Sequence, residues 1–278
     1  MKKIKYIICD LDGTLLNDQK RISEAQAAYI RQLREKTGIR FGFASGRAIS
    51  SLKPIAKENG LYEACDLYVA NNGADIHDGA TGEMTEMDMV SLDEMKYLLE
   101  LFRPYPYINV TFHNPGRFFA VYDTERARGI KELNHYPEMV SPFEQEYKTA
   151  PRVTLVFAPE RMEEVKKLVA GLKLPETIRF VQSEKDIIDL CHKTVSKAKG
   201  IEAYVKQFGD SLENVMAFGD NDNDLEMLRA AGVAVAMKNA TERVQKEADY
   251  VTEKTNNEDG IMHFLQEHED WFRSQEKA

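Results

Sequence analysis

The 278-residue chain is long enough for two domains, and its 43% hydrophobic and 30% charged residues are typical of a folded globular protein. A formal net charge of -9 argues against nucleic acid or an anionic membrane as the main partner, because both would be repelled. The three cysteines lack a CxxC spacing and no apolar run reaches the length of a membrane span, so we expect a cytoplasmic protein without membrane contact.

The first 80 residues alternate between predicted strands and helices. The apolar run at 6–9 predicts a strand buried on both faces of a parallel sheet, and a helix follows between Ser23 and Gly38. A second strand over 39–44 leads into another helix, and a third strand ends in the polar turn "NNGA" at 71–74. This alternation is typical of a doubly wound α/β domain.

The pattern changes near residue 84 and returns near residue 194. The middle of the chain combines a capped helix at 91–102, a hairpin signal at 107–123, and further strands and a helix up to residue 192. From Ser196 onward, helix and strand alternate again. We therefore expect a discontinuous core of residues 1–83 and 194–278, with an α+β domain of residues 84–193 inserted into it.

Polar side chains follow three of the predicted core strands. Asp10 and Asp12 come directly after the first strand, Ser45 follows the second, and Asp220 ends the strand "VMAFGD". Ligands of open α/β sheets bind beyond the carboxyl ends of the strands, so these groups should meet at one edge. Like charges repel each other and lose hydration on burial, so a cation or a phosphorylated ligand should accompany them.

The residue types at this edge suggest a phosphoryl-transfer site. Clustered carboxylates suit Mg²⁺, whereas the histidine and thiolate ligands that zinc prefers are not gathered in the sequence. Asp10 could attack phosphorus and form an aspartyl-phosphate, while Asp12 could exchange a proton with the departing oxygen and then with water. Thr14, Ser45 and the N–H groups near Gly46 could bind the phosphate oxygens. Lys197 is a candidate cation for them, and Lys199 is its rival.

These residues match four motifs in order. They are "DLDGT" at 10–14, "ASGR" with Ser45, "SKAKG" with Lys197, and "GDNDND" at 219–224. The set resembles the haloacid dehalogenase-like superfamily, and it is most similar to the Cof-type hydrolases of subclass IIB. The resemblance covers essentially the whole chain and includes "NNGA" and "AMKNA". It implies a Rossmann-like core, with the 84–193 insert as a type-2 cap domain of subclass B.

The resemblance also implies roles for individual residues. Asp10 would be the nucleophile and Asp12 the general acid and base, while Mg²⁺ would be held by Asp10, the carbonyl of Asp12, Asp220 and Asp224. Phosphate or substrate binding would involve Thr14, Ser45, Gly46, Arg47, Lys197 and Asn223. For Arg47 an exposed role is at least as compatible with the sequence, and Asp224 could act as a direct ligand or as support for one.

Three functions are compatible with these motifs. The first is a Mg²⁺-dependent phosphatase acting on a small phosphorylated metabolite such as a sugar phosphate, in a monomer or weak homo-oligomer. A sugar phosphomutase would use the same residues, and a regulatory protein could retain the pocket without turnover. The motifs alone do not name the substrate.

Overall fold

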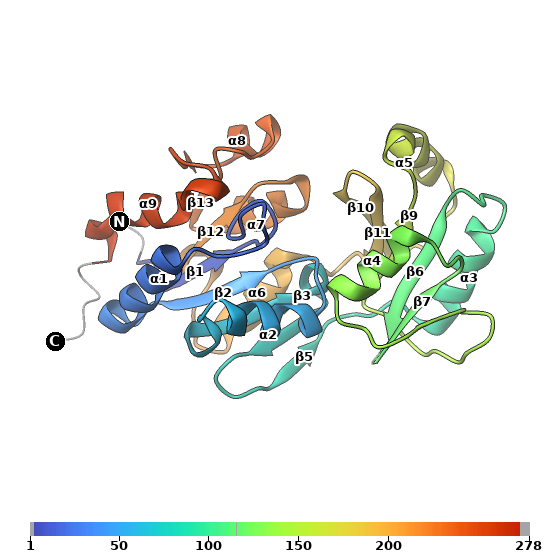
Figure 1. The fold of residues 1–278 in the computed structure, drawn as a ribbon, viewed down its shortest axis with the longest axis horizontal. Helices are drawn as coiled ribbons and strands as arrows, with labels where there is room; N and C mark the ends of the chain where they lie inside the picture. The colour runs from blue at the N-terminus through green and yellow to red at the C-terminus, as the bar shows by residue number, and fades with distance from the viewer. Residues whose placement is uncertain (1–2, 115, 273–278) are drawn as a thin grey trace. The chain divides into compact units, whose positions relative to one another are not determined.

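The chain forms two compact units, each with its own sheet and apolar core (Figure 1). The computed structural model describes residues 3–114 and 116–272. The first unit comprises Met1–Thr85 with Ser196–Ala278, and the second comprises Glu86–Val195. The predicted α/β class, a parallel-sheet core with an inserted α+β domain, is confirmed.

The sheet of the first unit has eight strands in the order β14-β13-β12-β1-β2-β3-β4-β5. Strands β1 to β3 and β12 to β14 pair in parallel, and β4 pairs antiparallel with β3. Strand β1 lies between β2 and β12, so segments from both ends of the chain meet at the centre. The strands are β1 (Tyr6–Cys9), β2 (Arg40–Ala44), β3 (Cys65–Ala70), β4 (Asp75–Asp78), β5 (Met84–Glu86), β12 (Val215–Gly219), β13 (Val233–Ala236) and β14 (Tyr250–Val251).

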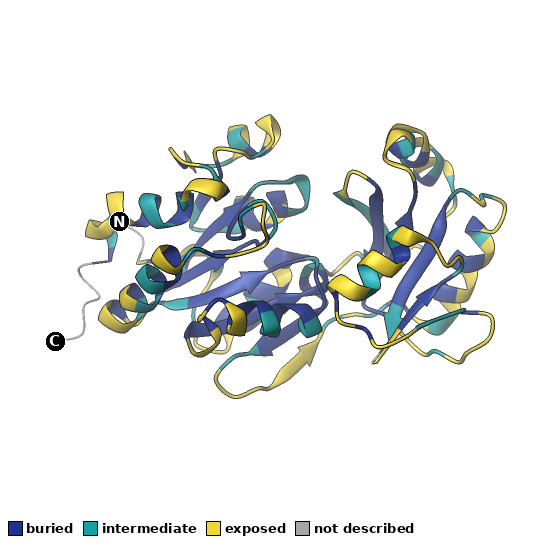
Figure 2. Cartoon of the chain, viewed as in Figure 1, coloured by how far each residue is buried: buried dark blue, intermediate teal, exposed yellow. Residues whose placement is uncertain are grey.

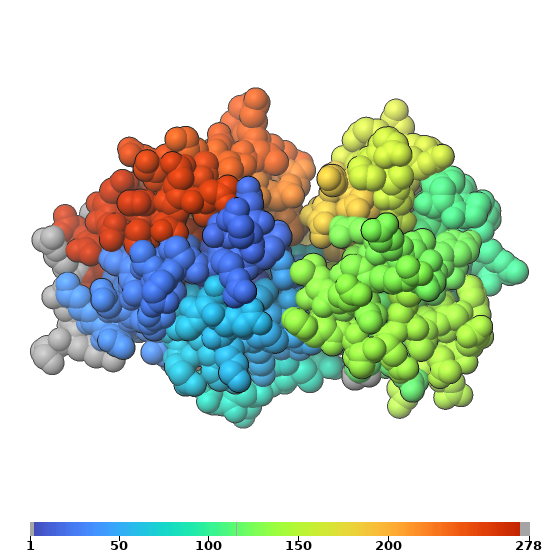
Figure 3. All heavy atoms as spheres, viewed as in Figure 1, coloured from blue at the N-terminus to red at the C-terminus, as the bar shows by residue number. Residues whose placement is uncertain are grey.

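Helices cover both faces of this sheet. Side chains of α1, α2 and α9 form one apolar core with the sheet, whereas α6 approaches the opposite face, where Gly200 packs closely on Val69. In the space-filling view, the blue N-terminal and red C-terminal segments of this unit lie against each other (Figure 3). The helices are α1 (Glu24–Thr37), α2 (Ile49–Glu58), α6 (Lys197–Lys206), α7 (Leu225–Ala230), α8 (Glu242–Glu247) and α9 (Gly260–Glu267).

The second unit is a six-stranded sheet in the order β10-β11-β9-β6-β7-β8, antiparallel except for the β7–β8 pair. Its apolar core joins one face of the sheet to α3 and α5. The strands are β6 (Asn109–Asn114), β7 (Arg117–Ala120), β8 (Met139–Val140), β9 (Val153–Val156), β10 (Ile178–Glu184) and β11 (Ile187–His192). The helices are α3 (Leu92–Phe102), α4 (Glu125–Leu133) and α5 (Met162–Gly171).

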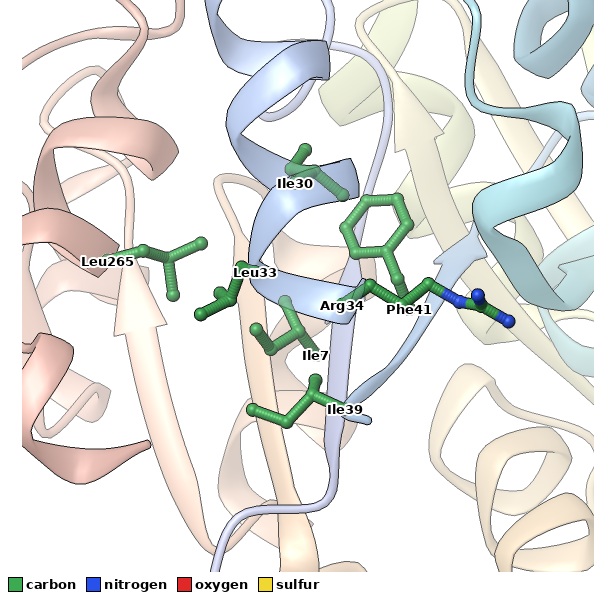
Figure 4. Close-up of a pocket in the computed structure, with 7 residues that line it drawn as sticks. All are labelled: Ile7, Ile30, Leu33, Arg34, Ile39, Phe41 and Leu265. Atoms are coloured by element: carbon green, nitrogen blue, oxygen red, sulfur yellow. The ribbon is translucent and has the colours of Figure 1, made fainter. Parts of the chain in front are cut away.

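Burial follows this layering, because the strands are largely buried and the helices expose their outer sides (Figure 2). A small apolar gap lies between α1, α9 and strands β1 and β2, and the guanidinium of Arg34 points away from it (Figure 4). That guanidinium binds Asp66 instead. The gap therefore belongs to the core and offers no polar group for chemistry. Among the described helices, none combines the length and apolar composition that a membrane crossing requires.

Candidate active site

Three carboxylates meet at the carboxyl edge of the first sheet. Asp10 follows β1 and Asp220 follows β12, and these strands are parallel neighbours. Asp224 ends the short turn of residues 222–224 that leads into α7. One carboxylate oxygen from each of the three residues lies within 4.8 Å of the other two. Asp224 is fully buried, and its Oδ2 accepts hydrogen bonds from the main-chain N–H groups of Asp220 and Asn221.

Lys197 supplies the positive charge in this cluster. It occupies the first turn of α6, whose N-terminus is capped by the hydroxyl of Ser196. Its side chain is 1% exposed, and Nζ donates to Oδ1 of Asp10 at 2.6 Å and to Oδ1 of Asp224 at 2.7 Å. Lys199 instead binds Glu202 on the surface of the helix. The structure therefore brings Lys197 to the carboxylates, not its rival Lys199.

The charges in the cluster do not balance. Three carboxylates and one ammonium leave a formal surplus of two negative charges. Burial, together with the charges of Asp224 and Asp220, raises the pKa of Asp10 well above its usual value. Burial and Asp224 likewise raise the pKa of Asp220 to about 7. A divalent cation would relieve this repulsion, and carboxylate oxygens are the ligands that hard cations prefer. The residues present therefore fit Mg²⁺.

The turn after β1 packs tightly against this cluster. Gly13 has φ of +84°, and a Cβ at this position would lie 2.5 Å from Oδ2 of Asp220, so only glycine fits. The hydroxyl of Thr14 donates to Oδ1 of Asp220 at 2.7 Å. The amide of Asn239, from the "AMKNA" segment, donates to the carbonyl of Gly13 at 2.7 Å. These contacts hold the turn that carries both predicted catalytic aspartates.

The carboxylate of Asp12 lies outside the three-residue cluster. It forms two hydrogen bonds of 2.7 Å with the guanidinium of Arg47 and one of 2.6 Å with Lys20. Although burial raises the pKa of Asp12, the hydrogen bonds from Arg47 and Lys20 lower it to about 2. A metal contact of Asp12 would therefore involve its carbonyl, as the resemblance implies. Lys20 was not among the predicted site residues, because nothing in its loop pattern distinguishes it from a solvated lysine.

The remaining predicted phosphate-binding residues lie on neighbouring loops of the first unit. Ser45 is buried after β2, and its Oγ accepts from the N–H of Arg47 at 3.2 Å. The Arg47 guanidinium is buried against Asp12 and Ser51, so an exposed role for it is wrong. A Cβ at Gly46 would lie 3.2 Å from the Asn72 amide oxygen, to which Asn223 donates at 3.5 Å. Asn72, in the turn "NNGA", was expected either to line the site or only to form the turn, and its amide lies beside Gly46 and Asn223.

Comparison with known proteins decides the family. The model of the haloacid dehalogenase-like hydrolases matches residues 7–265. The chain belongs to this family. It is 30% identical to the 5-amino-6-(5-phospho-D-ribitylamino)uracil phosphatase YitU of Bacillus subtilis, and the match covers 96% of this chain and 99% of that protein. The corresponding phosphatase YcsE of the same organism is 28% identical, with 93% of each chain covered.

Solved structures of this family share the fold over nearly the whole chain. A haloacid dehalogenase-like hydrolase from Bacteroides thetaiotaomicron has a TM-score of 0.82 at 27% identity and covers 96% of this chain and 100% of its own. The subclass IIB sugar phosphatase BT4131 has a TM-score of 0.80 at 26% identity, and the match covers 95% of this chain and 99% of that protein. The resemblance to the Cof-type, subclass IIB members is confirmed. The protein is a phosphoric monoester hydrolase of the haloacid dehalogenase-like family.

Proposed function

We propose that the protein is a Mg²⁺-dependent phosphatase that hydrolyses a small phosphorylated metabolite, a sugar phosphate or a similar phosphomonoester, through an aspartyl-phosphate on Asp10. The observation that carries the proposal is the cluster of buried Asp10 and Asp224 with half-buried Asp220, in which Lys197 pairs with Asp10 and Asp224. The relatives support the substrate class, because one is named a sugar phosphatase and two act on a phosphorylated ribityl compound.

The carboxylate cluster would hold the metal ion. Asp10, Asp220 and Asp224 offer carboxylate oxygens, and Asp12 offers its main-chain carbonyl. When bound, Mg²⁺ supplies positive charge that lets an anionic phosphate approach an anionic nucleophile. Ser45, Asn223 and the N–H of Gly46 would donate hydrogen bonds to the phosphate oxygens, and the Thr14 hydroxyl would do so after leaving Asp220, to which it donates in this structure.

Two aspartates of this chain would carry out the chemistry. A carboxylate oxygen of Asp10 bonds to phosphorus while the bond from phosphorus to the leaving oxygen breaks. Asp12 gives that oxygen a proton, and later takes one from the water that cleaves the aspartyl-phosphate. Because Arg47 and Lys20 keep Asp12 ionised, these ion pairs must loosen before Asp12 can carry a proton to the leaving group. Arg47 is thus placed to control the position of Asp12.

The second unit would act as the cap domain and select the leaving group. We assign this role to residues 84–193, in keeping with the subclass IIB relatives. We also expect a monomer or weak homo-oligomer in the cytoplasm. The three buried free cysteines, Cys9, Cys65 and Cys191, are compatible with a reducing compartment.

A substrate panel distinguishes the three candidate functions. Purified protein with Mg²⁺ is incubated with sugar phosphates, nucleotides and cofactor phosphates, and free phosphate is measured. We expect release of phosphate from several sugar phosphates or related phosphomonoesters. Isomerised sugar phosphate without free phosphate, in the presence of the matching bisphosphate, would instead identify a mutase. Tight binding without any turnover across the panel would identify a regulatory protein and contradict the proposal.

A further inference from the structure

Lys20 occupies a backbone conformation that a lysine rarely adopts. Its φ is 60°, in the left-handed region that glycine adopts without strain. Hydrogen bonds within the loop of residues 17–21 hold this conformation. The N–H of Lys20 donates to the carbonyl of Asn17 at 2.9 Å, and the N–H of Asn17 donates to the carbonyl of Arg21 at 2.9 Å. Backbone strain that the surrounding structure maintains is concentrated at functional sites, which makes Lys20 a candidate for a role in the reaction.

The ammonium group of Lys20 contacts the carboxylate of Asp12. Nζ donates to Oδ1 of Asp12 at 2.6 Å. The side chain of Lys20 is 56% exposed and that of Asp12 is 38% exposed. An ion pair with this much exposure contributes little to the free energy of unfolding. Stability therefore does not explain why a lysine, in place of a glycine, occupies the strained position.

The two carboxylate oxygens of Asp12 accept unequal numbers of hydrogen bonds. Oδ1 accepts from Lys20 at 2.6 Å and from Nη2 of Arg47 at 2.7 Å. Oδ2 accepts only from Nε of Arg47, at 2.7 Å, among the residues that the structure describes. Each oxygen of an ionised carboxylate has two lone pairs. Oδ2 is thus the oxygen that retains a lone pair to bind a proton, and Lys20 is the contact that makes the two oxygens differ.

We propose that Lys20 is a positioning residue, which holds Oδ1 of Asp12 so that Oδ2 exchanges the proton with the leaving group. When the bond from phosphorus to the leaving oxygen breaks, its electron pair stays on that oxygen, which takes the proton from Oδ2. When water later attacks phosphorus, the bond to Asp10 breaks and Oδ2 takes the proton from the water. The Lys20 contact at Oδ1 persists while the Arg47 contact at Oδ2 loosens. The inference rests on the proposed function, in which Asp12 is the general acid and base.

A lysine near the site would also attract an anionic substrate without acting through Asp12. Such an attraction changes kcat/KM by the same factor for all phosphomonoesters of equal charge. A role in positioning Asp12 depends on the leaving group instead, because p-nitrophenolate departs as a stable anion whereas an alkoxide needs a proton as it departs. The ratio of kcat/KM for an alkyl phosphate to kcat/KM for p-nitrophenyl phosphate therefore distinguishes the two roles.

Two substrates of similar size and equal charge, p-nitrophenyl phosphate and benzyl phosphate, test the proposal with Mg²⁺ present. The parameter kcat/KM reports the steps up to departure of the leaving group. Lys20→Met should lower kcat/KM for benzyl phosphate by about tenfold more than for p-nitrophenyl phosphate, which is part of the roughly 10²- to 10⁴-fold that a general acid contributes. Lys20→Arg retains a cationic donor and should keep the ratio within about threefold of wild type. The sugar phosphate that is hydrolysed fastest in the panel should behave as benzyl phosphate does.

Variants of the same loop separate the ammonium group from the backbone. Lys20→Gly suits the left-handed conformation but lacks the ammonium, so it should change the ratio as Lys20→Met does. Arg21→Met removes an exposed side chain that lies 3.7 Å from Glu58, and it should leave the ratio unchanged. An equal loss on both substrates in Lys20→Met, or no loss on the alkyl phosphates, would overturn the inference. Failure of the wild-type protein to hydrolyse even p-nitrophenyl phosphate would instead overturn the proposed function.

Discussion

Replacing Asp10 by asparagine is expected to lower phosphate release by at least about 10⁴-fold while the fold remains intact. An amide has nearly the same shape as the carboxylate but offers no anionic oxygen to attack phosphorus. The change also removes one of three crowded acidic groups, so the metal-free protein should not lose stability. The measurement is kcat on p-nitrophenyl phosphate with Mg²⁺, together with circular dichroism of the variant.

The neighbouring motif residue Asp222 provides the control for this experiment. It is partly exposed and pairs with Arg243 at 3.1 Å, outside the carboxylate cluster. Asp222→Asn should therefore retain activity within a few-fold of wild type. Asparagine can deamidate to aspartate, so Asp10→Ala serves as a second variant in which the carboxylate cannot form again. Turnover near the wild-type rate in a folded Asp10→Ala variant would show that another residue is the nucleophile.

Replacing Lys197 by methionine should lower the free energy of unfolding by about 3–5 kcal/mol and also abolish activity. The methionine fills similar space but leaves Asp10 and Asp224 buried without their cation. Removing one partner of a buried ion pair lowers the free energy of unfolding for this reason, whereas removing one partner of an exposed ion pair changes it little. Urea unfolding in the presence of a chelator measures the difference.

Lys199 offers a matched control two residues further along the same helix. Its exposed ion pair with Glu202 predicts a loss of no more than about 0.5 kcal/mol in Lys199→Met. Adding Asp224→Asn to Lys197→Met should recover part of the lost stability, because one uncompensated carboxylate disappears. Equal stability of the Lys197→Met and Lys199→Met variants would contradict the assignment of Lys197 as the buried counter-ion.

The sequence predicted the site best where strand ends determine it. Asp10 and Asp220 directly follow parallel neighbouring strands, so the strand pattern alone brings them to one edge. The residues alone did not decide between Lys197 and Lys199. Side chains two positions apart on a helix point in different directions, and the residue at which the helix starts determines which of the two faces inward. The position of Lys197 at the predicted helix start made it the first candidate, and the resemblance to the family also favoured it.

Side-chain partners in loops and strand register were beyond the sequence. Lys20 lies eight residues after Asp12, and its contact depends on how the intervening loop folds back, with Lys20 at φ of 60°. The helix α4 was missed because it is short and mostly polar, and Ala127 is its one buried residue.

The central claim is that the carboxylate cluster tolerates its charge by holding a divalent cation. Folding raises the pKa of Asp220 from 3.8 to about 7. The stability that this group contributes is therefore fully present below pH 3.8, where the carboxyl is protonated in both the folded and the unfolded chain, and it is lost as the pH rises through about 7. Without metal, the wild-type melting temperature should therefore fall between about pH 5 and about pH 8, and the Asp220→Asn variant should fall less.

The most direct test is the melting temperature of the wild-type protein with millimolar Mg²⁺ and with a chelator, at both pH values. We predict that Mg²⁺ raises the melting temperature clearly at about pH 8 and much less at about pH 5, where a proton on Asp220 competes with the ion. A melting temperature that does not respond to Mg²⁺ at about pH 8 would contradict the account.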